Sequence, residues 1–261
     1  FDSQDRPEFH RRVLAGTLRY RWARRNKQLQ HRFDLLNLDY VFMPWISDTF
    51  RDMYLSDPQN RNAILKYNYE NLFIMNWSYQ FVYNSRSLGN SASNYGTNAY
   101  TIRLGIETAG NLLYGLSSAS SMKRNADNQY TLFGIAYAQY AKLDFSFCKS
   151  FLINKNNSFA MRAAFGIAAP YGNSDILPYE KRYFSGGANS VRGWSVRELG
   201  PGSFIGNDGR IDFINQTGDI KLDLNVEYRT HLFWKFDGAA FIDAGNIWTI
   251  FDYETQPHGK F

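Results

Sequence analysis

One arginine in a glycine-rich run is the side chain of this sequence best suited to specific chemistry. The run extends from residue 183 to residue 202 and holds five glycines and one proline. Glycine and proline at this density predict a tightly folded loop whose backbone can approach another surface closely. A guanidinium in such a loop can form charge-assisted hydrogen bonds with carboxylates. The residues of this candidate motif are Gly186, Gly187, Val191, Arg192, Gly193 and Trp194.

Two acidic residues further along the chain are the candidate partners of Arg192. Glu227 lies on the polar face of the alternating stretch after the loop, and Asp243 lies on the next stretch. Because a very short turn joins the two stretches, we expect them to pair, with Asp243 on the same face as Phe241 and Gly245. A loop folded onto this face would bring Arg192 to both carboxylates. Breaking such a buried pair costs roughly 3–5 kcal/mol, which is enough to hold a loop in place.

Simpler explanations stay open for each of these residues. An acid inside a barrel is ordinarily just solvated, Gly245 can relieve crowding where strands bend, and Trp194 can belong to an interfacial aromatic belt. A phosphate-binding loop does not fit the run, because no Gly-Lys-Ser/Thr and no helical pattern follow it. Residues 207–212 lack the spacing of a twelve-residue calcium loop.

The remaining reactive residues do not suggest an enzyme. The chain has one cysteine, Cys148, and four histidines without ligand spacing, so we expect neither a metal centre nor a cofactor. No Ser/His/Asp set or isolated carboxylate pair stands out. The formal charge of +5 is mild and, outside residues 19–27, basic residues are scattered among acidic ones. This distribution argues against nucleic-acid binding.

Period-two alternation is the strongest structural signal in the chain. Large apolar side chains alternate with polar, charged or small ones, which predicts strands with one apolar face. Most of these stretches are about nine residues or longer, enough to cross a bilayer at a tilt. The expected strands lie within residues 13–22, 36–42, 73–83, 100–107, 133–148, 159–167, 222–229 and 236–248.

The connections between these strands favour a membrane barrel over a soluble sandwich. Shorter connections (23–30, 84–95, 154–157 and 232–234) alternate with longer ones (43–67, 111–128 and 171–217). In an up-and-down meander every long loop then falls at one end, as in outer-membrane barrels. The aromatic content of 17% also suits a barrel with aromatic belts. No apolar run approaches the ~18 residues of a transmembrane helix.

We therefore predict an all-β, antiparallel, up-and-down transmembrane barrel that is incomplete. About eight strands are expected, and residues 251–261 hold Pro and Gly without alternation, which predicts a loop and not a closing strand. The first strand begins near residue 8. We expect residues 1–261 to be an open piece of a larger barrel domain with a long inward-folded loop at about 171–217.

The glycine-rich run and residues 241–245 together resemble the C-terminal barrel of the BamA/TamA superfamily. Members have sixteen strands, and their long sixth extracellular loop carries a Val-Arg-Gly-aromatic motif that folds into the lumen. The resemblance implies that Arg192 is this loop arginine, and that Glu227 and Asp243 are the acids of the twelfth and thirteenth strands. Trp194 stands where the family more often has Phe or Tyr. The expected strands would then be the sixth to the thirteenth, without the terminal strands and the periplasmic POTRA repeats.

The resemblance also implies a function that composition cannot supply. These proteins insert or export β-strand substrates without ATP, through a weak seam that templates incoming strands. Residues 199–204 and 246–248 look most like the TamA-like TamL proteins of Bacteroidota. The implied setting is the outer membrane of a Gram-negative bacterium, with lipids, unfolded outer-membrane clients and a TamB-like periplasmic protein as partners. A partner-secretion transporter and a passive pore are the alternatives.

Overall fold

The structure is a computed structural model of the chain. It describes residues 2–7, 9–25, 27–49, 71–86, 98–126, 128–206, 215–253 and 255–261. Residues 207–212, and parts of the connections expected at 43–67, 84–95 and 171–217, lie outside the described residues.

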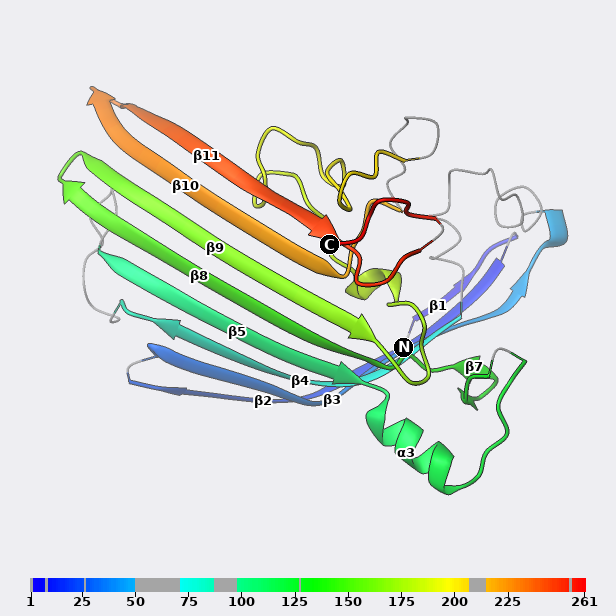
Figure 1. The fold of residues 1–261 in the computed structure, drawn as a ribbon. Coiled ribbons are helices and arrows are strands. Elements are labelled where there is room, and N and C mark those ends of the chain that lie inside the picture. The colour runs from blue at the N-terminus through cyan, green and yellow to red at the C-terminus, as the bar shows by residue number, and fades with distance from the viewer. Residues whose placement is uncertain are drawn as a thin grey trace.

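One large antiparallel sheet of nine strands dominates the molecule (Figure 1). Its strands follow one another in the order β1-β2-β3-β4-β5-β8-β9-β10-β11. Their bounds are β1 Asp2–Asp5, β2 Phe9–Arg24, β3 Leu29–Ile46, β4 Leu72–Asn84, β5 Ala99–Ala109, β8 Tyr140–Asn154, β9 Asn157–Pro170, β10 Ile220–Phe233 and β11 Phe236–Trp248. The sheet is curved and open, because its edge strands β1 and β11 do not pair within the described residues. The prediction of an incomplete up-and-down barrel wall is thus confirmed.

Alternation along the strands separates two faces of this sheet. Leu224 and Ile242 lie on the convex face and are 44% and 76% exposed, although both are apolar. Asn225 and Asp243 pair directly across β10 and β11 and lie on the concave face. An apolar convex face and a polar concave face are what a barrel wall in a bilayer requires, because lipid covers the first and the lumen hydrates the second.

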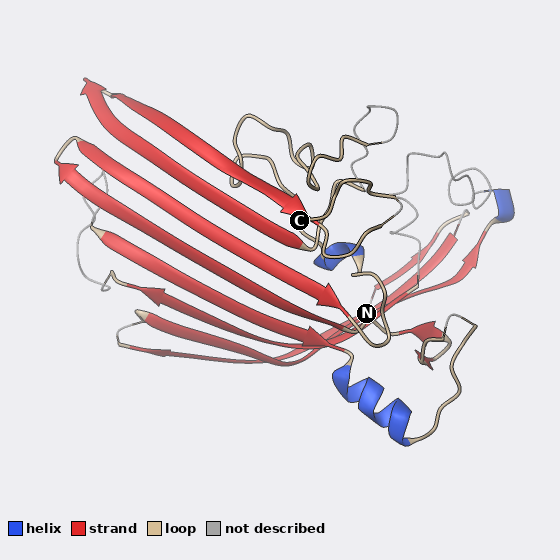
Figure 2. Ribbon diagram, viewed as in Figure 1, coloured by secondary structure: helices blue, strands red, loops and turns tan. Residues whose placement is uncertain are grey.

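The two ends of the sheet differ in the length of their connections, as predicted. Residues 25–28, 85–98, 155–156 and 234–235 join strands at one end, which we call the short-turn end. Residues 47–71, 110–139 and 171–219 join strands at the other, the long-loop end. The described helical segments, among them α3 (Asn111–Ala119) and η1 (Tyr179–Lys181), all lie at the long-loop end (Figure 2).

Buried apolar side chains gather at the long-loop end and not between two sheets. One cluster joins Ile74 of β4 and Tyr140 of β8 to the loop residues Leu177 and Tyr183. A second cluster packs Phe73 against residues of the 110–139 connection. The core therefore forms where loops cover the wall, which separates this fold from a sandwich whose sheets bury each other.

Three parts of the prediction need correction. Residues 133–137 were expected to extend the strand that continues to residue 148. Instead Thr131–Leu132 (β6) and Ile135–Ala136 (β7) form a separate hairpin, because Phe133 and Gly134 both have positive φ and turn the chain. The polar residues of β1 did not predict an edge strand, and no helix was expected in the 111–128 connection.

The side chain of Asn173 fastens this hairpin to the end of the sheet. It donates hydrogen bonds of 2.9 Å to the carbonyl oxygens of Tyr130 and Tyr137, and it accepts one of 2.6 Å from the Tyr130 amide. Asn173 is buried. A buried backbone group without a hydrogen-bond partner is costly. This one side chain supplies a partner for three backbone groups of the hairpin.

Substituting Asn173→Ala should loosen the hairpin without opening the sheet. Each backbone group left unpaired costs on the order of 1–3 kcal/mol, so amide exchange at residues 128–137 of the full-length protein should accelerate. The exposed turn residue Asn156 lies at the other end of the sheet, and Asn156→Ala is the control. Unchanged exchange in the Asn173 variant would contradict this account.

Candidate functional site

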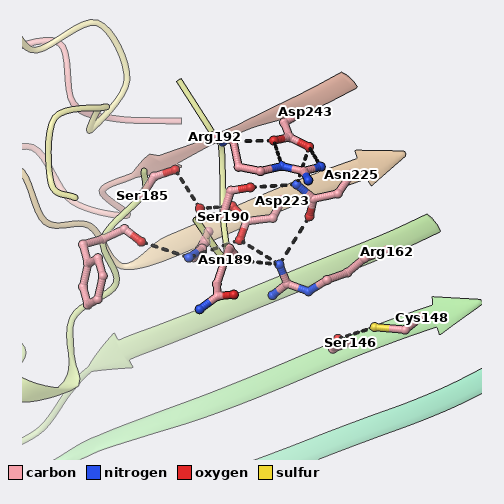
Figure 3. Close-up of polar contacts among 12 residues, drawn as sticks. Ser146, Cys148, Arg162, Ser185, Asn189, Ser190, Arg192, Asp223, Asn225 and Asp243 are labelled. Carbon is pink, nitrogen blue, oxygen red and sulfur yellow. Dashed lines mark hydrogen bonds and ion pairs between the residues drawn. The ribbon is translucent and has the colours of Figure 1, made fainter. Parts of the chain in front are cut away.

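The guanidinium of Arg192 lies against two carboxylates of the lumen wall, Asp243 and Glu227. Figure 3 shows its contact with Asp243. Its Nε and Nη2 donate hydrogen bonds of 2.7 and 2.8 Å to the two carboxylate oxygens of Asp243 on β11. Its backbone amide donates a third bond of 3.0 Å to the same carboxylate. Its Nη1 donates to Glu227 on β10. The loop is thus held at this point by both the side chain and the backbone of one residue.

The burial of Asp243 makes this ion pair important for the stability of the site. The Asp243 side chain is 2% exposed, whereas that of Arg192 keeps 24% exposure. A carboxylate this buried needs a partner, because an isolated buried charge is strongly unfavourable. The guanidinium also lies 3.8 Å from the ring centroid of Phe241, a cation–π geometry. Hydrogen bonds to Asp243 and Glu227 raise the pKa of Arg192, so its charge is permanent.

The glycines upstream of Arg192 shape a tight turn. Gly186 has φ of +94°, and a Cβ there would meet the Ser195 carbonyl oxygen at 2.1 Å, so only glycine fits. The Gly187 amide donates a 2.8 Å hydrogen bond to the carbonyl oxygen of Trp194 and closes the turn. Gly193, with φ of +103°, lies in open space. The Trp194 side chain is 48% exposed.

Val191 and Gly245 fit together beside the ion pair. Val191 is buried, and a Cβ at Gly245 would lie 3.1 Å from its Cγ2 and 2.5 Å from the Leu222 carbonyl oxygen. The strand must therefore lack a side chain here for the loop to reach the wall. Gly245 is thus required both by the neighbouring strand, whose Leu222 carbonyl oxygen lies nearest, and by the loop residue Val191.

A row of four carboxylates, which we call the carboxylate row, extends the contact across the wall. Four loop residues, taken in chain order, each bind one carboxylate of the row. The contacts are Lys181 Nζ–Glu107 at 2.8 Å, Tyr183 OH–Asp144 at 2.7 Å, Ser190 Oγ–Asp223 at 2.9 Å and Arg192 Nε–Asp243 at 2.7 Å. The four acids belong to β5, β8, β10 and β11 respectively. The loop thus crosses the wall strand by strand.

Strand β9 supplies no acid to the carboxylate row. It contributes the cation Arg162 and, at Gly166, a stretch of backbone without a side chain. Arg162 donates a 2.7 Å hydrogen bond to the Asn189 carbonyl oxygen, and its Nη1 lies 3.7 Å from Asp223 (Figure 3). A Cβ at Gly166 would lie 2.6 Å from the Tyr183 ring, so this ring rests directly on the β9 backbone. Asn225 of β10 links the loop to β11. Its amide donates hydrogen bonds of 2.7 Å to the Ser190 carbonyl oxygen and 2.9 Å to Asp243.

A second polar cluster closes the base of the loop. Arg182 lies 3.6 Å from Asp219 and donates a 2.8 Å hydrogen bond to Gln256. Gln256 in turn donates a 2.7 Å bond to the Thr217 carbonyl oxygen. Burial raises the pKa of Asp219, and it raises that of Tyr253 to about 12. The segment after β11 is therefore packed against both ends of the loop.

Several residues of this site were not predicted as contacts. Alternation already placed Glu107, Asp144 and Asp223 on the polar face, but nothing in the sequence distinguished them from ordinary lumen acids. Their loop partners, Lys181 and Ser190, have no local signature. The set offers hydrogen-bond and ion-pair chemistry suited to docking a loop. Among the described residues no group of three or more His, Cys, Asp or Glu could hold a metal ion.

Comparison with known proteins identifies the family of this wall and loop. Residues 48–259 match the Omp85 superfamily domain, a span that includes β4 to β11 and the whole of the long loop. The chain belongs to the Omp85 superfamily. Membership and the open, barrel-like sheet together indicate a Gram-negative outer-membrane protein. The described part of the chain has no helix long and apolar enough to span a membrane.

Two individual proteins illustrate the likeness of this Omp85 chain. Outer membrane protein assembly factor BamA of Neisseria meningitidis serogroup B is 28% identical over 107 residues, which cover 38% of this chain and 12% of that protein. The crystal structure of BamA from Haemophilus ducreyi lacking POTRA domains 1-3 superposes with a TM-score of 0.54 at 15% identity. That likeness covers 93% of this chain and 43% of the other, and it concerns the fold.

A double-mutant cycle on Arg192 and Asp243 should show strong coupling. Arg192→Ala is expected to weaken loop docking by roughly 3 kcal/mol, the low end for buried pairs because Arg192 is partly exposed. Asp243→Ala in the same background should cause no further loss and should recover part of it, because it removes the buried carboxylate left without a partner. The measurement is the denaturant dependence of proteolysis within residues 171–217 of the full-length protein.

Arg229 supplies the matched control for this cycle. Its Nε binds Glu227 at 2.5 Å, but its side chain is 60% exposed and belongs to strand β10. Arg229→Ala should leave loop protection unchanged. Additive effects of the Arg192 and Asp243 substitutions, or equal effects of Arg192→Ala and Arg229→Ala, would contradict the assigned contact.

Substituting Gly245→Val should displace the loop by steric means and leave every charge in place. The new side chain would collide with the Leu222 carbonyl and with Val191. We expect faster proteolysis within residues 171–217. The adjacent Ala244 lies on the opposite face of β11, where it pairs with Leu224, so Ala244→Val is the control. Equal protease resistance of both variants would contradict the close approach.

Proposed function

We propose that this chain is part of the barrel wall of an outer-membrane protein assembly or translocation factor, and that Arg192 is a structural latch in it. Residues 1–261 supply a partial barrel domain whose loop, about 171–217, folds into the lumen. The single observation that carries the proposal is the Arg192 contact with Asp243 and Glu227, within a chain of the Omp85 superfamily.

The latch would act on the wall and not on the substrate. Arg192 and its neighbours hold the loop across five adjacent strands, from β5 to β11. A braced wall allows another part of the barrel to open without the whole sheet losing its curvature. An opened seam exposes unpaired backbone groups that can template an incoming strand, and this requires no ATP.

Finer aspects of the proposal concern subtype and partners. The runs at residues 199–204 and 246–248 favour a TamA-like protein of the TamL type found in Bacteroidota. Such a protein would act on unfolded outer-membrane clients, in contact with outer-membrane lipids, and would work with a TamB-like periplasmic partner. We propose no catalytic step and no cofactor.

Insertion of a client barrel tests this function directly. The full-length protein, reconstituted in liposomes without ATP, should accelerate folding of a urea-unfolded outer-membrane barrel relative to empty liposomes. Arg192→Ala should reduce this acceleration, because the loop no longer braces the wall, whereas Arg229→Ala should preserve it. Folding is read as the heat-modifiable shift of the client on gels.

Other outcomes would assign the chain elsewhere in the superfamily or outside it. Steady ion conductance with no effect on client folding would indicate a passive pore. Export of one dedicated soluble partner, again without client folding, would indicate a partner-secretion transporter. Full activity of the Arg192→Ala protein, together with an unprotected loop, would contradict the latch while leaving the assembly function intact.

A further inference from the structure

The connections at the short-turn end of the wall carry basic residues without acidic ones. The four connections at this end contain five cations and neither Asp nor Glu, and residues 87–97, which lie outside the description, contain no charged residue. The long loops at the other end mix both signs. On the adjoining strands, Arg24 and Lys149 add two more cations, and the exposed Asp237 near the start of β11 adds one acid, which pairs with His231. Together we call these cations the basic rim: Arg24, Arg25, Lys27, Arg86, Lys149, Lys155 and Lys235.

Aromatic rings on the convex face form a belt next to this rim. Neighbouring strands contribute rings in contact with one another. The pairs, with the distances between ring centroids, are Trp22–His31 at 4.7 Å, His31–Phe81 at 5.5 Å, Tyr83–Tyr100 at 5.5 Å, Phe159–Tyr228 at 5.3 Å and Phe233–Phe236 at 5.3 Å. Aromatic girdles of membrane barrels lie at the level of the lipid headgroups. The belt therefore places the basic rim at the phosphates of one leaflet.

Two cations of the rim lie near exposed aromatic rings. Lys149 pairs in register with Tyr100 and Met161, opposite in parity to the lumen-facing Arg162, and its Nζ lies 4.4 Å from the Phe151 ring centroid. Lys235 Nζ lies 5.6 Å from the ring of Trp234, which is 76% exposed. A lysine stem on an apolar surface with its ammonium at the interface is the snorkelling arrangement.

We propose that the basic rim binds the phosphate headgroups of anionic phospholipids in the leaflet that meets the short turns. The cations are distributed along the short-turn end of the sheet, one or two per turn. They lie at the same height along the barrel axis as the aromatic belt. This distribution matches a planar layer of phosphates better than a compact acidic protein surface. The proposal rests on the membrane barrel and not on assembly activity, so either can fail without the other.

Lipid selectivity measured by electron spin resonance tests the proposal. The full-length protein is reconstituted in phosphatidylcholine bilayers that contain trace spin-labelled phosphatidylglycerol or spin-labelled phosphatidylcholine. We expect a larger immobilised fraction for phosphatidylglycerol, and the difference should shrink as salt screens the charges. Equal association of the two lipids with the unmodified protein would overturn the proposal, and this comparison requires no variant to fold.

Paired variants locate the effect on the rim. A cation near an anionic lipid surface contributes about fivefold to binding. The double variant Lys155→Gln/Lys235→Gln should therefore lower the mean preference for phosphatidylglycerol by at least about twofold. Lys155→Arg/Lys235→Arg should retain the preference. The matched control is Lys123→Gln/Lys260→Gln, which removes two exposed cations outside the rim.

The variants also separate lipid from protein as the occupant. Loss of the preference in the control pair, or an unchanged preference in the Lys155→Gln/Lys235→Gln protein, would overturn the assignment to the rim. If the unmodified protein shows no lipid preference and the rim variant instead loses an acidic protein that co-purifies with the unmodified form, the rim is a protein-docking surface. That result would contradict lipid binding.

Discussion

Asp243 imposes the constraint on which the site depends. Its carboxylate is almost fully buried in the lumen wall, where a charge without a partner is prohibitively costly. In the described part of the chain, the cation that pairs with Asp243 comes from the loop and not from a wall strand. Arg192 satisfies the carboxylate with its guanidinium and its amide. Pairing this one acid therefore holds the loop residue Arg192 against the concave face of the sheet.

The rest of the loop follows from that anchoring. Once Arg192 is in place, Ser190, Tyr183 and Lys181 reach the other members of the carboxylate row. Each contact is made to a different strand, so the loop resists relative sliding of neighbours as well as its own release. Buried apolar side chains gather at this same end. At the long-loop end, the wall is therefore held by packed side chains and loop contacts. Along the rest of its length, it is held by backbone hydrogen bonds between neighbouring strands.

Alternation predicted eight long strands, and all eight are present as β2 to β5 and β8 to β11. It failed where the chain leaves the sheet. Phe133 has a side chain of strand type, yet its positive φ places it in a turn, since local backbone geometry overrides a short apolar pattern. The sequence does not predict helix α3, because the connection that contains it has no strand alternation and indicates only a loop.

By itself, the sequence determined the strands, their two faces and the asymmetry of their ends, because side-chain period and connection length are local properties. It also determined that Glu227, Phe241, Asp243 and Gly245 share a face, since a short turn sets the register of β10 and β11. Only the tertiary structure decided which lumen acids the loop meets. The carboxylate row joins residues up to about 75 positions distant from their loop partners. Such contacts depend on how the whole wall curves, and no local pattern encodes that curvature.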